Sequence, residues 1–151
     1  MPLHLALYQP DIPQNVGAAI RLCACLGFNL DIIEPCAFPW KESEFRRTAM
    51  DYKDIAQITR HTSWAAFQSA YEGQRRILMT TKGATNLYDF SFQDGDILLM
   101  GRESAGVPDN VHAEVSERII IPMSGNARSL NIVNAAAIAC GEVVRQVRFS
   151  A

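Results

Sequence analysis

The sequence lacks the marks of a membrane or secreted protein. No apolar run approaches the roughly 20 residues that a membrane-spanning helix requires. The first residues, Met1 to Leu5, show neither the basic start nor the long apolar stretch and small-residue cleavage site of a secretory signal. We therefore expect a cytoplasmic chain that has no membrane segment.

Cysteine is scarce and scattered. The chain has four thiols: Cys23, Cys25, Cys36 and Cys140. They form no C-x-x-C pair and have no partner histidines at zinc spacing, so we expect no metal and interpret them as small apolar packing residues. The three histidines are isolated in sequence as well: His4, His61 and His112. An ordinary buried or surface position is favoured for each.

An excess of positive charge is also missing. The formal net charge is -2, whereas nucleic-acid-binding proteins usually carry a basic surface that releases counterions from phosphates. Any contact with RNA must come from local basic groups: Lys41, Arg46, Arg47, Lys53, Arg60, Arg145 and Arg148. For any single member, a solvated helix face with acidic neighbours is an equally good interpretation.

The composition that remains is that of a globular chain. Apolar residues make up 48% of the 151 residues and charged residues 20%, and no repeat or low-complexity tract interrupts them. We predict one domain over residues 1–151, which is long enough to bury about two-thirds of its unfolded surface.

Apolar segments alternate with helix-compatible segments along the chain. Strands are predicted at residues 3–8, 29–34, 76–80, 96–100 and 118–121. Helices are predicted from N-caps at Asn15 and Ser63, with C-caps at Gly27 and Gly73, and over residues 41–50 and 129–149. This alternation predicts an α/β fold, a mostly parallel sheet flanked by helices on both faces.

The glycine fingerprint of dinucleotide-binding folds is absent. After the first strand, the run from Asn15 to Arg21 has only Gly17 where G-x-G-x-x-G needs three glycines, so NAD and FAD are disfavoured. Two polar loops late in the chain, one from Gly101 to Gly106, each follow an apolar strand. Loops at the carboxyl ends of strands bind ligands in open α/β sheets, so the sequence predicts a ligand site there.

Three segments stand out together by their order and spacing. They are Asn15-x-Gly17-x-x-x-Arg21, Gly101-x-Glu103-x-x-Gly106, and Ile121-Pro122 followed by Ser129-Leu130-Asn131. They resemble the three motifs of the SPOUT RNA methyltransferases. The wider sequence resembles the small tRNA (cytidine/uridine) 2'-O-methyltransferases that modify the wobble nucleotide, and the resemblance covers nearly the whole chain.

The resemblance implies S-adenosylmethionine as methyl donor, the wobble pyrimidine (C34 or modified U34) in the tRNA anticodon loop as target, a homodimer, and a C-terminal trefoil knot. By analogy, the cofactor site comprises Met79, Gly101, Gly106, Ile121, Ser129 and Leu130. Adenosylmethionine needs backbone hydrogen bonds, close glycine approach and apolar walls, which these residue types supply. For each glycine an ordinary turn is the simpler alternative, as is a core position for Met79 and Ile121.

Candidate catalytic residues follow from the same motifs: Arg21, Asn15, Glu103, Ser129 and Asn131. Methyl transfer to a ribose 2'-hydroxyl develops negative charge on oxygen, which the guanidinium of Arg21 would stabilise without being deprotonated. Glu103 would fix Arg21 or the ribose by a charge-assisted hydrogen bond. Ser129 and Asn131 would position the hydroxyl, although both residue types also favour the N-cap of the last helix.

Two alternatives stay open at this stage. One is the same chemistry on another tRNA position or on ribosomal RNA, and the other is a non-catalytic nucleotide- or RNA-binding module. The last helix also departs from the relatives that the resemblance points to, with Cys140-Gly141-Glu142 in place of Leu-Tyr-Glu and Val133 in place of a serine. These departures concern the expected dimer contact and leave the three motifs intact.

Overall fold

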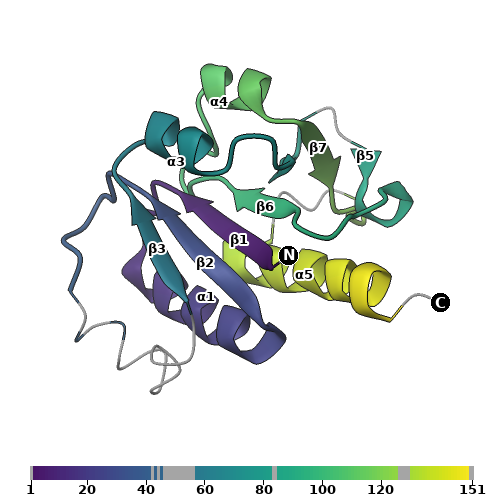
Figure 1. Ribbon diagram of the computed structural model, residues 1–151, viewed down its shortest axis with the longest axis horizontal. Helices are drawn as coiled ribbons and strands as arrows, with labels where there is room; N and C mark the ends of the chain where they lie inside the picture. Colours follow the sequence, from purple (N-terminus) through teal and green to yellow (C-terminus); the bar gives the residue numbers. More distant parts are fainter. Residues whose placement is uncertain are drawn as a thin grey trace.

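A parallel sheet with helices on both faces forms the body of the molecule (Figure 1). The computed structural model describes residues 2–41, 43, 45, 57–82, 85–125 and 130–149. Over these residues the strands are β1 (Leu3–Tyr8), β2 (Phe28–Ile33), β3 (Ile58–His61), β4 (Arg76–Met79), β5 (Thr85–Asn86), β6 (Ile97–Met100) and β7 (Glu117–Ile120). The helices are α1 (Pro13–Leu26), α3 (Trp64–Ala70), η2 (Leu87–Asp89), α4 (Asp109–Glu114) and α5 (Ile132–Arg148).

The strand order brings segments that are distant in sequence side by side. The order is β3-β2-β1-β6-β4-β7-β5, and every pairing is parallel. At the carboxyl ends, Leu7 of β1 pairs with Met100 of β6, which pairs in turn with Met79 of β4. The loops that follow these strands therefore emerge together at one edge of the sheet.

Alternate side chains of the central strands enter two separate apolar cores. Leu5 and Leu7 point to the face that α1 and α5 cover, where Ile20 is also fully buried. Ala6 and Tyr8 point to the opposite face, where α3 and α4 lie. Strands covered on both faces are nearly continuous runs of apolar residues, which is the pattern by which their positions were predicted.

The predicted α/β class and mostly parallel sheet are confirmed, and five strands lie within a residue or so of their predicted bounds. The sequence pattern missed β3, β5 and α4. β3 contains two exposed residues and only one that is fully buried, and β5 has only two residues, so neither has the apolar run that marks a strand. None of the helices in the described ranges is long and apolar enough to cross a membrane.

Three helix ends differ from prediction. Asn15 is not an N-cap, because α1 begins at Pro13 with Ile12 as the capping residue. α3 ends at Ala70 with Tyr71 as its C-cap, and Gly73 takes a left-handed φ of 86° two residues after that cap. The long final helix begins at Ile132 with Asn131 as its cap. Gly27 and Ser63 cap their helices as predicted, and the predicted helix at 41–50 lies almost wholly outside the described residues.

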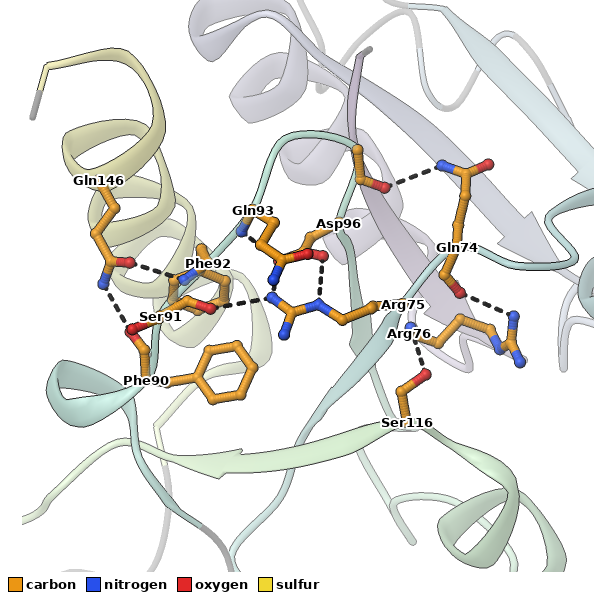
Figure 2. Close-up of polar contacts among 11 residues, drawn as sticks. Gln74, Arg75, Arg76, Phe90, Ser91, Phe92, Gln93, Asp96, Ser116 and Gln146 are labelled. Atoms are coloured by element: carbon orange, nitrogen blue, oxygen red, sulfur yellow. Dashed lines mark hydrogen bonds and ion pairs between the residues drawn. The ribbon is translucent and has the colours of Figure 1, made fainter.

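A group of hydrogen bonds and an ion pair lies at the amino ends of the central strands β4 and β6 (Figure 2). The guanidinium of Arg75 donates to both carboxylate oxygens of Asp96, at 2.9 and 2.6 Å. Beside this pair, the Gln146 side chain of α5 accepts from the backbone N–H of Phe92 and donates to the carbonyl of Phe90, both at 2.8 Å. The Gln146 bonds fasten the end of α5 to the segment between η2 and β6, at the end away from the predicted ligand loops.

Candidate active site

A cavity of about 700 Å³ opens at the carboxyl ends of β4, β6 and β7. Its size lies within the range of small-molecule sites. Apolar side chains form part of its wall, and polar loop residues form the remainder. The lining residues include Ile12, Asn15, Met79, Thr80, Lys82, Gly101, Arg102, Glu103, Gly106, Asp109, His112, Ile121, Leu130 and Asn131.

The loop after β6 closes on itself at the mouth of this cavity. The backbone N–H of Arg102 donates to the carbonyl of Gly106, and the N–H of Gly106 donates back to Arg102, both at 3.0 Å. A Cβ at Gly101 would lie 2.8 Å from the Cα and carbonyl carbon of Gly106, and Gly106 itself has a φ of 63°. Both glycines are therefore needed, Gly101 for the close return of the backbone and Gly106 for its left-handed conformation.

The loop after β1 is bonded to the loop after β6. The Asn15 side-chain amide donates to Oε1 of Glu103 at 3.1 Å, and the backbone N–H of Asp11 donates to Oε2 at the same distance. In return, the Asp11 carboxylate accepts from the backbone N–H of Glu103 at 3.3 Å and from the hydroxyl of Ser104. Asn15 thus serves the site from inside the first turn of α1, where it holds Glu103.

The two carboxyl groups of this junction have opposite pKa shifts. Burial raises the pKa of Glu103, and the neighbouring Asp11 side chain raises it further. Interaction with the Glu103 side chain and the bonds from Ser104 and backbone N–H groups lower the pKa of Asp11 to about 2, against the opposing effect of burial. As the pH falls, Glu103 therefore takes up a proton before Asp11.

The structure brings most of the predicted site residues to this cavity. Met79, Gly101, Gly106, Ile121 and Leu130, all predicted to bind the cofactor, line it. Of the predicted catalytic residues, Asn15, Glu103 and Asn131 also line it. Ser129 lies outside the described residues.

Arg21 lies apart from the cavity lining, and Asn131 has a second, structural role. Arg21 is an exposed residue of α1, six positions after Asn15, and is not among the residues that line the cavity. Asn131 lines the cavity but also caps α5, because its Oδ1 accepts from the backbone N–H of Val133 at 2.8 Å and of Asn134 at 3.2 Å. The alternative of helix capping for Asn131 is therefore confirmed.

Sequence reasoning missed Asp11, which does not line the cavity but bonds to two residues of the loop that does. A short acidic residue between Pro10 and Pro13 is typical of a turn that accepts backbone N–H groups, and this was the available signal. His112 and Lys82 also line the cavity without having been predicted. No cluster of His, Cys, Asp and Glu suited to a metal ion occurs among the residues that the structure describes.

The fold and the cavity together define a class, that of α/β proteins which hold a small ligand on loops at the carboxyl edge of a parallel sheet. Within that class, the chain belongs to the SpoU rRNA Methylase family, which matches residues 2–141. The SPOUT resemblance predicted from the three motifs is thereby confirmed.

Individual relatives are similar over nearly the full chain. A tRNA (cytidine(34)-2'-O)-methyltransferase of Beijerinckia indica is 52% identical over 145 residues, which are 95% of this chain and 91% of that protein. A solved structure described as "Structural insights into the 2-OH methylation of C/U34 on tRNA" is 41% identical with a TM-score of 0.91, covering 95% of each chain. The SpoU methyltransferase AviRb from Streptomyces viridochromogenes, in complex with the cofactor AdoMet, is 27% identical with a TM-score of 0.84, covering 96% of this chain and 60% of that one.

Proposed function

We propose that this chain is a cytoplasmic, S-adenosylmethionine-dependent tRNA methyltransferase that methylates the ribose 2'-hydroxyl of the wobble pyrimidine, C34 or modified U34. The observation that carries the proposal is the cavity at the carboxyl edge of the sheet, which gathers residues of all three motifs. The names of the full-length relatives support the same reaction and the same nucleotide.

The residues of the cavity fit adenosylmethionine. This ligand has an adenine edge, a ribose diol and a compact sulfonium, so it calls for backbone hydrogen bonds and apolar walls. Met79, Ile121 and Leu130 supply apolar surface, and the backbone at Gly106 is open to close approach because nothing lies within 4 Å of the place where a side chain would begin. Ser129 completes the proposed binding set on sequence grounds.

Adenosylmethionine supplies an electrophilic methyl group. In the proposed reaction the 2'-hydroxyl oxygen takes the methyl group in place of its proton, which passes to solvent water, and the sulfonium leaves as the neutral thioether of S-adenosylhomocysteine. Arg21 is exposed on α1 and does not line the cavity, so it would stabilise the developing negative charge from outside the cofactor pocket, where the RNA ribose enters. Glu103 and Asn15 hold the start of α1, the helix that carries Arg21, against the cofactor loop.

The proposed RNA contact relies on basic side chains, and several of the described ones are already engaged within the chain. Arg60 pairs with Glu34 and lies over the ring of Trp40 at 4.6 Å. Arg148 donates to carbonyls at the end of α1. Arg46, Arg47 and Lys53 lie outside the described residues, so the tRNA contact proposed for them rests on sequence alone.

We include a homodimer in the proposal. Three large apolar side chains near the starts of α1 and α5 or on α5 itself are partly exposed: Ile12 (40%), Leu130 (39%) and Ile138 (38%). The small-residue run of α5 suits either packing within the chain or a helix-mediated dimer, and two of its members, Ala136 and Ala139, are buried in the core that α5 shares with α1. A second copy packed on α5 at Ile138 would cover apolar area that the single chain leaves in water, whereas Ile12 and Leu130 also line the cavity.

The test is incubation with labelled adenosylmethionine and total tRNA, followed by mapping of the modified nucleotide. We expect a 2'-O-methyl group at position 34. Arg21→Ala should still bind cofactor and should lose most turnover, whereas near-normal turnover would exclude the role given to Arg21. The family description names rRNA, so ribosomal RNA is tested as a second substrate in a parallel incubation. Label in rRNA alone would favour that alternative, and cofactor binding without label in any RNA would indicate a non-catalytic module.

A further inference from the structure

The junction between the first motif and the second includes a residue that belongs to neither. Asp11 and Glu103 are 92 positions apart, yet each side chain accepts a hydrogen bond from the backbone N–H of the other. The hydroxyl of Ser104 adds a further bond to Asp11. Such reciprocal bonding ties two loops at their backbones, so neither loop can shift without breaking several contacts at once.

We propose that Asp11 is a positioning residue for methyl transfer, whose carboxylate holds the Gly101–Gly106 loop against the start of α1 and fixes the Glu103 carboxyl beside Asn15. The inference rests on the function proposed above. Asp11 does not line the cavity and acts through Glu103, which does. Each oxygen of the Glu103 carboxyl accepts a hydrogen bond, one from the Asn15 amide and one from the backbone N–H of Asp11. These two bonds fix the orientation of the carboxyl group.

The charge of Asp11 has a second consequence. A carboxylate beside a partly buried carboxyl group disfavours ionisation of the latter, in agreement with the raised pKa of Glu103. Other titratable groups border the same cavity: Arg102 from the same loop, Asp109 and His112 from α4, and Lys82 from the segment after β4. Asp109 is the carboxylate of this set, whereas Asp11 lies outside the cavity lining and accepts a bond from the Glu103 backbone.

The bonding pattern indicates which form of Glu103 is the working one. Its two oxygens accept from the Asn15 amide and the Asp11 N–H, and an ionised carboxylate accepts both bonds with greater strength than a neutral acid. Activity should therefore fall on the acid side as Glu103 becomes protonated. Removing the Asp11 charge should move that acid limb to lower pH, because Glu103 then ionises more readily.

The experiment compares the wild-type protein with Asp11→Asn, Asp11→Ala and two control variants. Asp11→Asn removes the charge and keeps a side chain of the same shape, and Asp11→Ala removes both. Ser104→Ala keeps the charge and loses one bond of the junction, and Asp109→Asn removes a negative charge from the same cavity without touching the junction. Each folded variant is followed by ¹³C titration of the Glu103 carboxyl, by calorimetric binding of adenosylmethionine, and by the pH profile of kcat/KM.

We expect Glu103 to titrate at lower pH in Asp11→Asn and Asp11→Ala, with the acid limb of kcat/KM shifted in the same direction. Neither control should move the titration comparably. Asp11→Ala should also lose about tenfold or more in kcat/KM, since loss of positioning reduces rate strongly. An unmoved Glu103 titration in Asp11→Asn would overturn the proposal, as would equal losses in Asp11→Ala and Ser104→Ala with unchanged pH profiles. The carboxyl titration needs no RNA, so it tests the link between Asp11 and Glu103 even if the protein does not catalyse the proposed methyl transfer.

Discussion

At the scale of single residues, Asp31 of β2 is a fully buried carboxylate that lies outside the site. Its carboxylate accepts from Tyr71 at 2.6 Å and lies 2.7 Å from a ring nitrogen of His4 and 2.8 Å from one of His61. Two histidines that are isolated in sequence therefore meet on one carboxylate across three neighbouring strands. A buried carboxylate is tolerated only when such partners replace its water.

The Asp31 network makes a prediction about acid stability. Burial raises the pKa of Asp31, but the bonds from His4, His61 and Tyr71 outweigh it, and the net pKa is lowered. The stability that the carboxylate contributes is present above its pKa in the unfolded chain and is lost as the pH falls through the lower folded pKa. Tyr71→Phe removes one donor, so the folded pKa should rise and acid unfolding should begin at a higher pH.

We expect Tyr71→Phe to lower the free energy of unfolding at neutral pH by about 1–2 kcal/mol, since a hydrogen bond to a charged group is lost. Urea unfolding at pH 7 and circular dichroism during acid titration measure the two effects. Tyr88→Phe is the matched control, because Tyr88 is 56% exposed. An acid midpoint that is the same in Tyr71→Phe and the wild type would refute this account of Asp31.

At the scale of elements, the helix α5 shows how one residue can serve both the fold and the site. Asn131 caps the helix through Oδ1 and also lines the cavity. The far end of α5 is held by the bonds of Gln146 to the segment after η2 (Figure 2). The cap therefore sets where the helix starts relative to a cofactor, and the far end keeps the helix from moving along its axis.

Substitutions at Asn131 separate the two roles. Asn131→Ala should lower the free energy of unfolding by about 1 kcal/mol through loss of the cap. The cap uses only Oδ1 of Asn131, which leaves the amide N–H₂ for a role in the site. Asn131→Asp keeps an acceptor oxygen for the cap and removes this N–H₂ group. The variant should therefore retain stability and lose methyl transfer. The measurements are urea unfolding and methyl transfer on the same preparations. Full activity in Asn131→Asp would show that capping is the whole role of this residue.

The elements differ in how well the sequence foretold them, and the reasons are physical. β1 and β6 were predictable because both their faces are buried, which leaves continuous apolar runs. β3 was not, because an edge strand with exposed Thr59 and Arg60 resembles a loop. Within the site, glycine spacing located the loop after β6, but no local pattern reports a bond between Asp11 and Glu103 across 92 positions. Asn15 was placed as a cap because its type suits one, whereas its partner lies in another loop.

At the scale of the whole molecule, the strand order explains how the motifs meet. β1 lies between β2 and β6, so the loop that leads into α1 stands next to the loop of the second motif. The third motif follows β7, on the far side of β4. The trefoil knot that the resemblance implies stays a prediction, as does the dimer.

Light scattering tests the dimer. We expect a mass near twice the 16.7 kDa of one chain. Ile138→Lys places a charge on the partly exposed apolar surface of α5 and should shift the mass toward that of a single chain, whereas Tyr88→Lys, on η2, should leave it unchanged. A wild-type protein that has the mass of one chain at working concentration would exclude the dimer.

The most direct measurement of the central claim compares two transcripts of one tRNA, identical except at nucleotide 34. One carries cytidine there and the other 2'-deoxycytidine, which has no hydroxyl to accept a methyl group. With labelled adenosylmethionine, the account predicts close to one methyl group per molecule of the cytidine transcript, and none on the deoxycytidine transcript. Equal incorporation into both transcripts, or none into either while adenosylmethionine binds, would contradict it.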